Sequence, residues 1–299
     1  MTPSCTLSWS RRRSRWVAAA VFGLSAVAGG QAQAVEIEPL RLELTGAPGQ
    51  TVTGTLAVTN RRAEAVRLAA KAGAYRYVFT AHTVPPQNPH AQRLPSCEAW
   101  LVTAPETLVE GGATATLSYT VTIPADAQPP AAEYVAALLV DERPGQAPAA
   151  EPPGDTPGRG TVTILPRIAI PVYVFLAGHD TPQGRIAEFR ADAGPQPGIT
   201  RLLLTLANDG EVHVRPTGTV LVTDLHGAVV SRTPLGRTIP IFPRFQEGIP
   251  LLLPLAPGRY TAVATVQLGP SGGQTVGPAL LQQNLAFTVT ADGRVQTDR

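Results

Sequence analysis

The chain has 299 residues, of which 43% are hydrophobic and only 15% are charged. This apolar content is enough for packed cores, which excludes a wholly disordered chain, and 30 prolines with 28 glycines break helices too often for a helical bundle or coiled coil. The formal charge is +2, and four arginines lie within residues 11–15, so the remainder carries no electrostatic signature of a nucleic-acid or anionic-membrane binder. The length corresponds to about two domains.

Residues 1–34 have the pattern of a secretory signal peptide. The arginine cluster is followed by the apolar stretch 17–28 and then by Ala32-Gln33-Ala34, a small-x-small cleavage site. The apolar stretch is too short to span a bilayer as a stable anchor. We therefore expect cleavage before Val35 and a mature protein in the periplasm, or else secreted or at the cell surface, without membrane insertion.

From residue 35 onward, apolar and polar residues alternate with period two, which predicts β-strands. Turn residues separate these runs roughly every 8–12 positions, the spacing of a β-sandwich. The strands expected in the first half are 35–38, 40–44, 51–59, 66–70, 75–80, 100–103, 113–123 and 134–140. The predicted fold class is all-β.

Residues 142–160 are rich in proline, glycine and alanine and have almost no apolar bulk. Such a segment cannot offset its ordering entropy by burial, so it is either an interdomain linker or a long disordered loop. The β-branched run that follows, 161–177, is too extended to begin a new domain comfortably. We interpret it as the last strand of a first sandwich at 35–178, with 142–160 as a hairpin loop.

A second sandwich is predicted at 184–290, followed by a disordered tail at 291–299. Its expected strands are 201–207, 217–223, 228–231, 248–253, 260–268 and 281–290. Two patterns occur in both halves in the same order: a strand that ends in a turn-forming asparagine (Asn60, Asn208), and a tyrosine near the start of a late strand (Tyr134, Tyr260). The second pattern is typical of immunoglobulin-like sandwiches. The sequence therefore predicts two immunoglobulin-like β-sandwich domains in tandem after a cleaved signal peptide.

The chain lacks the motifs of catalysis. No nucleophile elbow, zinc-protease helix or phosphate-binding glycine loop occurs, and the five histidines lie in turns or near strand ends. Cys97 is the one cysteine left after the leader, so no internal disulfide can form, and we expect it to be a buried thiol. We predict a protein that is not an enzyme and needs no cofactor or metal.

Three segments of the first half carry a more specific pattern: Ile37-Glu-Pro-Leu-Arg41-Leu, the run from Gly49 to Asn60, and the run from Val162 to Tyr173 with Arg167 inside it. Together they resemble the N-terminal domain of the periplasmic pilus (fimbrial) chaperones, two-domain immunoglobulin-like proteins that hold pilus subunits before assembly. The resemblance covers about residues 35–177. It implies a chaperone-like function in the periplasm.

In that family, two basic residues in the interdomain cleft bind the subunit's terminal carboxylate. Alternating apolar residues of the final strand complete the subunit's unfinished sandwich. The resemblance implies Arg41 and Arg167 as the carboxylate anchors and Val162 and Ile164 as donated side chains. The predicted partner-binding set also includes Ile168 and Ile170 of the same strand.

The same resemblance implies that both guanidinium groups face the cleft, close to each other and not fully neutralised by carboxylates of their own chain. The sequence departs from the family in having Arg167 where lysine is usual. Pro166 and Pro171 each remove a hydrogen-bond donor from the predicted final strand, which is acceptable at a sheet edge but awkward inside a sheet.

The partner expected from these features is a secreted protein subunit, pilin-like, or another cell-surface protein. Two other functions fit two sandwiches of this kind. One is a structural cell-surface or extracellular adaptor, although those proteins usually carry a C-terminal membrane helix. The other is a carbohydrate-binding or enzyme-accessory module, which would need exposed aromatic side chains.

Overall fold

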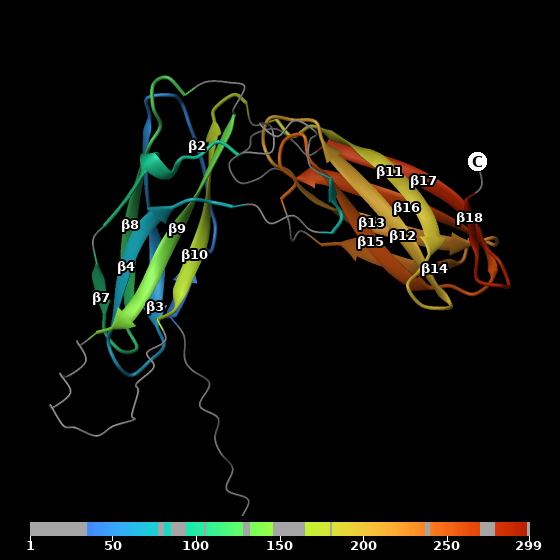
Figure 1. Cartoon of the computed structure of the whole chain (residues 1–299), viewed down its shortest axis with the longest axis horizontal. Helices are drawn as coiled ribbons and strands as arrows, with labels where there is room; N and C mark the ends of the chain where they lie inside the picture. Colours follow the sequence, from blue (N-terminus) through green and yellow to red (C-terminus); the bar gives the residue numbers. More distant parts are fainter. Residues whose placement is uncertain are drawn as a thin grey trace, which may run out of the picture. The chain divides into compact units, whose positions relative to one another are not determined.

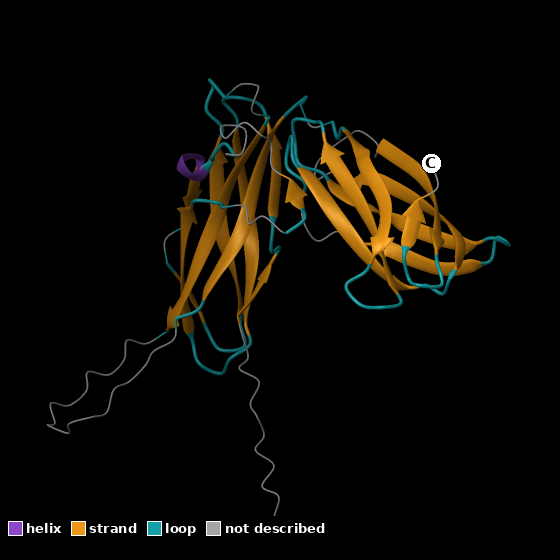
Figure 2. Ribbon diagram, turned by 45° about the vertical axis from the view of Figure 1, so that its right-hand side comes forward, coloured by secondary structure: helices purple, strands orange, loops and turns teal. Residues whose placement is uncertain are grey.

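The segments in which apolar and polar residues alternate form β-strands at nearly all of the predicted positions (Figures 1 and 2). The computed structural model describes residues 35–76, 81–84, 94–104, 106–127, 132–145, 165–179, 181–236, 240–269 and 279–297. Within these ranges the only helical element is a single 3-10 turn, η1 (Glu98–Trp100). The all-β prediction is confirmed. The predicted signal peptide, residues 1–34, lies outside the described residues.

In the first sandwich two sheets, whose strands are mostly antiparallel, pack face to face. One has, in the described part of the chain, the strand order β1 (Val35–Glu38), β3 (Thr51–Asn60), β8 (Thr114–Thr122) and β6 (Leu101–Thr103). The other has the order β2 (Leu42–Gly46), β10 (Arg167–Leu176), β9 (Glu133–Pro144), β4 (Val66–Gly73) and β7 (Thr107–Val109).

Strands β9 and β10 form the hairpin expected from the sequence. They pair antiparallel from Arg167 opposite Asp141 to Phe175 opposite Glu133. The end of the run 161–177 therefore does belong to the first sandwich. The predicted loop begins later than expected, because Glu142–Pro144 remain in β9, paired with β4. Residues 146–164 lie outside the described residues.

Strand β10 contributes to two hydrophobic cores, because successive side chains of a strand point to opposite faces. Its even-numbered residues Ile170, Val172, Val174 and Leu176 lie in the core of the first sandwich. Tyr173 and Phe175 belong instead to the core of the second sandwich. Both faces of this strand are thus buried, which explains its nearly continuous apolar sequence.

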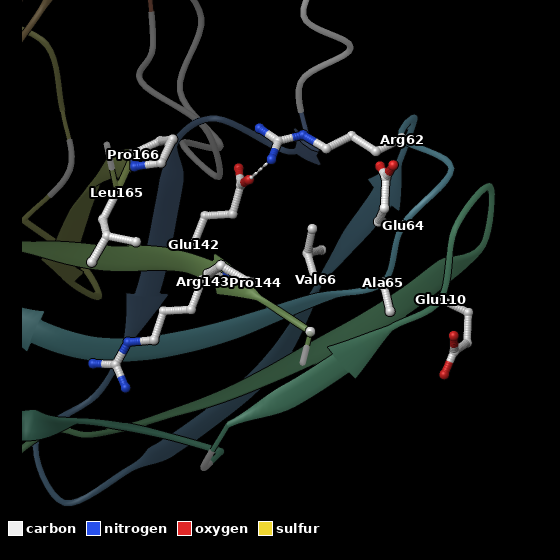
Figure 3. Close-up of a pocket in the computed structure, with 11 residues that line it drawn as sticks. Arg62, Glu64, Ala65, Val66, Glu110, Glu142, Arg143, Pro144, Leu165 and Pro166 are labelled. Carbon is white, nitrogen blue, oxygen red and sulfur yellow. Dashed lines mark ion pairs between the residues drawn. The ribbon is translucent and has the colours of Figure 1, made fainter. Parts of the chain in front are cut away.

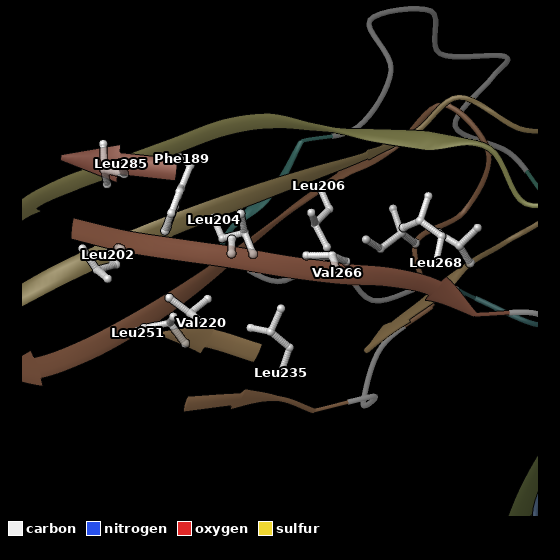
Figure 4. Close-up of a cluster of buried hydrophobic side chains, with 14 of the residues drawn as sticks. Phe189, Leu202, Leu204, Leu206, Val220, Leu235, Leu251, Val266, Leu268 and Leu285 are labelled. Carbon is white, nitrogen blue, oxygen red and sulfur yellow. The ribbon is translucent and has the colours of Figure 1, made fainter. Parts of the chain in front are cut away.

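The second sandwich also has two sheets, with the following orders in the described residues. The first is β11 (Gly184–Ala193), β12 (Ile199–Asn208), β15 (Gln246–Pro254) and β5 (Thr83–Val84). The second is β14 (Val229–Leu235), β13 (Arg215–Asp224), β16 (Gly258–Gly269), β17 (Ala279–Val289) and β18 (Val295–Thr297). Leucine, valine and phenylalanine side chains from both sheets fill the space between them (Figure 4).

The strand-end asparagines confirm the predicted relation between the two halves. Asn60 and Asn208 are fully buried, and each donates from Nδ2 to the carbonyl oxygen four residues later at 2.8 Å. Each Oδ1 accepts the backbone N–H two residues later, at 3.0 and 2.9 Å. Tyr260 makes the expected corner, its hydroxyl donating to the carbonyl oxygen of Ala256 at 2.8 Å.

Three sequence-based expectations were wrong. The tail 291–299 contains strand β18, since Val295 returns to pair with Val289 and packs against the core. Thr83 and Val84, which fall within the predicted first sandwich, pair with β15 of the second sandwich. The expected strand 75–80 is absent at Tyr75 and Arg76, and the rest of it lies outside the described residues.

Within the described ranges, no helix is long and apolar enough to cross a membrane.

Candidate functional site

The first half of β10 forms an open sheet edge. Strand β9 pairs with β10 from Arg167 to Phe175, whereas β2 pairs with it only from Val172 onward. Upstream of β2 the chain bends at Leu40 and continues into β1, which belongs to the opposite sheet. Among the described residues no strand covers the outer side of residues 167–171. An unpaired edge of this kind can accept another strand.

The backbone of this segment divides its hydrogen-bonding groups between the two sides. The N–H of Glu142 donates to the carbonyl of Pro166 at 3.0 Å, which identifies these two residues as a hydrogen-bonded pair. Such pairs recur at every second residue of an antiparallel ladder. Ile168 and Ile170 therefore direct their backbone groups toward β9, and Ala169 directs its N–H and C=O to the open side.

Pro171 lies at an outward position of the same segment, one residue before the pairing with β2 begins. Its missing N–H removes no bond to β9, because the inward positions make that ladder. Proline is found in strands at such edges. The proline that looked awkward in the sequence thus marks where the open edge ends.

Arg167, one of the predicted carboxylate anchors, is exposed and already has an acidic partner. Its Nε and Nη2 both donate to Asp141, the second at 3.0 Å, and Lys71 Nζ lies 3.5 Å from the same carboxylate. The hydrogen bond from Arg167 and the two positive charges lower the pKa of Asp141 to about 2. This guanidinium is therefore neutralised within its own chain, contrary to the expectation from the sequence.

The predicted apolar contact residues occupy different environments. Ile168 is half-buried and packs against the core of the first sandwich. Ile170 is 0% exposed within that core, so its side chain serves this chain's own packing and is not available to a partner. Val162 and Ile164 lie outside the described residues.

Arg41, the other predicted anchor, lies in a different setting. It lines a hollow of about 540 Å³. We call this hollow the two-arginine pocket; its lining residues are Pro39, Leu40, Arg41, Tyr75, Pro171, Tyr173, Arg215 and Pro240. Because Pro171 belongs to both, the pocket adjoins the end of the open edge.

The structure does not bring Arg41 and Arg167 together. Leu42 pairs with Val172, so Arg41 lies beside Pro171, and Arg167 lies four residues upstream, at the start of β10. At about 3.3 Å per residue, this separates the two backbones by roughly 13 Å along the strand. Arg41 instead shares its pocket with Arg215 of β13.

Behind the pocket lies a group of buried charges that we call the buried charge cluster: Glu43, Glu133, His213 and Arg215. The backbone N–H of His213 donates to Glu133 Oε2 at 2.6 Å, and its Nδ1 lies 2.6 Å from Glu133 Oε1. Glu43 Oε1 is 2.7 Å from Arg41 Nε, 3.5 Å from Arg215 Nε and 3.8 Å from His213 Nε2. One carboxylate thus faces three basic groups.

The histidine of this cluster favours its protonated form. Burial lowers the pKa of His213, but the charge and hydrogen bond of Glu133 and the contact with Glu43 outweigh it, so the pKa is raised. Each ring nitrogen faces a carboxylate, an arrangement that suits an imidazolium with two N–H donors. The cluster joins β2 and β9 of the first sandwich to β13 and the residues before it.

Sequence reasoning missed Glu43, Glu133, His213 and Arg215. The second half offered no motif for comparison, and a charge at a strand start is normally solvated. One signal was present: in His213-Val214-Arg215 the polar residues alternate with valine at the start of a predicted strand, and all three are buried.

A second hollow, of about 550 Å³, lies at the other end of β9 (Figure 3). Glu142 points across it to Arg62, with Arg62 Nη1 2.6 Å from Glu142 Oε1. This arginine already has a buried acid as its partner. The hollow therefore has less unbalanced positive charge to attract an anionic ligand than the two-arginine pocket has.

Cys97 is buried, as expected, and burial raises the pKa of its thiol to about 12, which makes it unreactive. Among the described residues, no group of three or more histidine, cysteine, aspartate or glutamate side chains is placed to hold a metal ion.

The fold and the site define a class: two immunoglobulin-like sandwiches in tandem with an open strand edge beside a basic pocket. Comparisons with family models and with curated proteins find no match. Solved structures similar to this chain include chaperones of pilus systems, the family that the sequence resembles.

Three of these structures illustrate the likeness. The E. coli chaperone DraB is 14% identical over 84% of this chain and 95% of its own, with a TM-score of 0.44. The Pseudomonas aeruginosa CupB2 chaperone is 12% identical over 88% and 97%, with a TM-score of 0.40. The Salmonella enterica SafB chaperone, solved with SafA pilin, is 12% identical over 84% and 95%, also with a TM-score of 0.40. At such identities the likeness is one of fold.

Proposed function

We propose that this protein is a non-enzymatic, chaperone-like protein of the periplasm that holds a secreted, pilin-like subunit. It does so by adding one strand of the subunit to the open edge of β10 and by anchoring the subunit's terminal carboxylate. The observation that carries the proposal is that no strand among the described residues pairs with the outer side of residues 167–171, an edge that ends beside the two-arginine pocket.

The backbone geometry supports the proposal of strand addition. Ala169 presents an N–H and a C=O to the open side, and Arg167 presents another pair one outward position earlier. A partner strand would satisfy these groups as a ladder does, while its alternate side chains provide specificity. We propose that Val162 and Ile164, upstream of this edge, and the half-buried Ile168 contact the subunit's own apolar residues.

The charges support the proposal of carboxylate anchoring. The planar fork of Arg41 can hold a carboxylate with two charge-assisted hydrogen bonds, and its side chain is 41% exposed. Arg167 is the second anchor that the family resemblance implies. For that role it would have to exchange Asp141 for the subunit's carboxylate, so we assign the main anchor to Arg41.

The test uses two proline substitutions one residue apart in the same strand. The tagged full-length chain is exported, and the secreted proteins that co-purify with it are identified by mass spectrometry. Ala169→Pro removes an outward N–H only, and we expect a folded protein that loses its bound subunit.

Ile168→Pro is the comparison for folding alone, because it removes an inward donor of the β9 ladder and should lower the thermal midpoint, which Ala169→Pro should not. Equal recovery of the same subunit with the wild type and a folded Ala169→Pro variant would exclude strand addition at this edge.

A further inference from the structure

We infer that Arg215, contributed by the second sandwich, completes the carboxylate-binding site with Arg41, so that the two-arginine pocket takes the free C-terminus of a polypeptide. This inference rests on the proposed function and deepens it. It assigns the second anchor to a residue that the family resemblance did not indicate, in place of Arg167.

The first support is the state of Arg215 itself. Its side chain is only 6% exposed, yet it lines the pocket. Among the described residues its Nε has no hydrogen-bond partner, and the nearest acidic oxygen, Glu43 Oε1, is 3.5 Å away. A buried donor without an acceptor costs stability unless a ligand supplies one. The guanidinium carbon lies 5.6 Å from the ring centroid of Tyr173, which holds the group in place.

The second support is the local charge. Arg41 and Arg215 both face Glu43, whose single negative charge cannot neutralise two guanidinium groups. Glu133 is held by the backbone N–H and the ring of His213 and does not line the pocket. The described groups around the pocket therefore leave a net positive charge, which an anion would balance.

The third support is the shape and lining of the pocket. Tyr75 and Tyr173 add two hydroxyl groups, which lie 3.4 Å apart, and prolines with Leu40 form apolar walls. A peptide terminus matches this lining because its carboxylate meets the arginines while its last side chain meets the apolar wall. The strand that ends there would continue along β10, since Pro171 belongs to both the pocket and the open edge.

Arg167 is less suited to the same task. Its two hydrogen bonds go to Asp141, on the strand it is paired with, and Lys71 supports the same carboxylate. Releasing Arg167 would leave Asp141 with Lys71 as its one described cation, 3.5 Å away and without the two hydrogen bonds of the guanidinium. Arg215 needs no such exchange.

The experiment measures the preference of the purified mature chain for a free carboxylate. The probe is a short peptide of alternating valine and threonine, with either a free C-terminal carboxylate or a C-terminal amide, titrated by calorimetry. We expect the acid to bind at least about tenfold more tightly than the amide, because charge-assisted hydrogen bonds form only with the acid. Arg215→Gln and Arg41→Gln should each remove most of that preference.

Arg167→Gln and the exposed, surface-paired Arg61→Gln are the controls, and both should keep the preference. A folded Arg215→Gln variant that still prefers the acid tenfold would overturn the inference. If that variant does not fold, Arg215→Lys decides: it keeps the charge but not the planar fork, so its acid preference should fall, and an unchanged preference would contradict the assignment.

The same data separate this inference from strand addition. If Ala169→Pro loses both peptides while wild type binds acid and amide equally, the edge binds strands and the pocket assignment is wrong. If the acid preference depends on Arg215 but Ala169→Pro binds as wild type does, the pocket is an anchor and strand addition is wrong.

Discussion

The two sandwiches use the same local turn and differ in how their edges are closed. Asn60 and Asn208 end equivalent strands with the same pattern of side-chain hydrogen bonds to the backbone. In the first sandwich, however, the described residues pair with β10 on both sides only over its second half. The asparagine turn is thus the same in both sandwiches, whereas the open edge of β10 arises from the pairing of strands that are far apart in the sequence.

Charge is also distributed differently. Most ion pairs of the second sandwich lie at the surface, as between Arg185 and Asp209 or Arg190 and Glu188. Next to the two-arginine pocket, by contrast, Glu43, Glu133 and His213 are buried. Surface pairs contribute little, while breaking a buried pair is costly. The predictions below test this contrast, beginning with the largest expected effect.

His213→Ala should be the most destabilising of the substitutions we consider, by about 3–5 kcal/mol, because Glu133 stays buried and keeps the backbone N–H of residue 213 but loses the imidazole that faces its other oxygen. Urea unfolding of the mature chain measures this. Arg185→Ala, at an exposed pair, is the comparison and should leave the midpoint nearly unchanged. A loss below about 1 kcal/mol in His213→Ala would show that the buried pair does not support the fold.

The same histidine predicts a pH dependence. Its pKa is raised in the folded chain, mainly by Glu133 against the opposing effect of burial, so its contribution is fully present below the unfolded pKa of about 6.5. That contribution is lost as the pH rises through the folded pKa. The difference in unfolding free energy between wild type and His213→Gln should therefore shrink between neutral and alkaline pH. A difference that grows with pH would contradict the assignment.

Asn208→Ala should cost about 2–4 kcal/mol, and Asn60→Ala somewhat less, because both carbonyl contacts of the Asn208 amide are buried, whereas two of the three carbonyl contacts of the Asn60 amide are only partly buried. Unfolding followed by calorimetry compares the two variants. Equal losses would mean that the equivalent turns carry equal weight; a larger loss in Asn60→Ala would refute the argument from burial.

Substitutions of the two late-strand tyrosines should change the free energy of unfolding less. Tyr260→Phe removes the corner hydrogen bond to Ala256 and should cost about 0.5–1.5 kcal/mol. Tyr134 instead packs its ring on Trp100, with centroids 4.3 Å apart, and Tyr134→Phe keeps that contact. Thermal unfolding should therefore separate the two variants. The account fails here if Tyr134→Phe proves the more destabilising.

Arg167→Ala should have the smallest effect on folding, leaving the thermal midpoint unchanged, because the side chain is exposed. Its signature is local: the pKa of Asp141, about 2 in the wild type, should rise toward its ordinary value, with Lys71 still favouring the ionised form. An NMR titration of the carboxyl group measures this shift. An unchanged pKa would mean that Arg167 does not hold Asp141 in solution.

The predictable parts of this molecule are those encoded within a few residues. The alternation of apolar and polar residues predicted the strands, and the equivalent asparagines Asn60 and Asn208 predicted that the two halves are related, because both patterns depend on local geometry. Strand β18 was missed because a run as short as Val295–Thr297 has too little pattern to distinguish it from a tail. The pairing of Thr83 and Val84 with β15 depends on residues far away in the sequence.

The site was predicted only in part for the same reason. Arg41 was singled out by its place in the opening segment; it lines the two-arginine pocket, and its role in binding stays a prediction. Arg215 was not found, since nothing within its own segment shows that it would lie beside Arg41. Ile170 was predicted to contact a partner because the sequence alone does not distinguish an apolar strand residue that faces a partner from one that faces its own core.

Amide hydrogen exchange of β10, free and with the captured subunit bound, tests the central claim most directly. The claim is that a partner strand occupies the open edge of residues 167–171. We predict that the Ala169 amide, which faces the open side, exchanges readily in the free chain and much more slowly in the complex, while the Ile168 amide, bonded to β9, is protected in both. Slow exchange of Ala169 in the free chain, or no change on binding, would contradict strand addition at this edge.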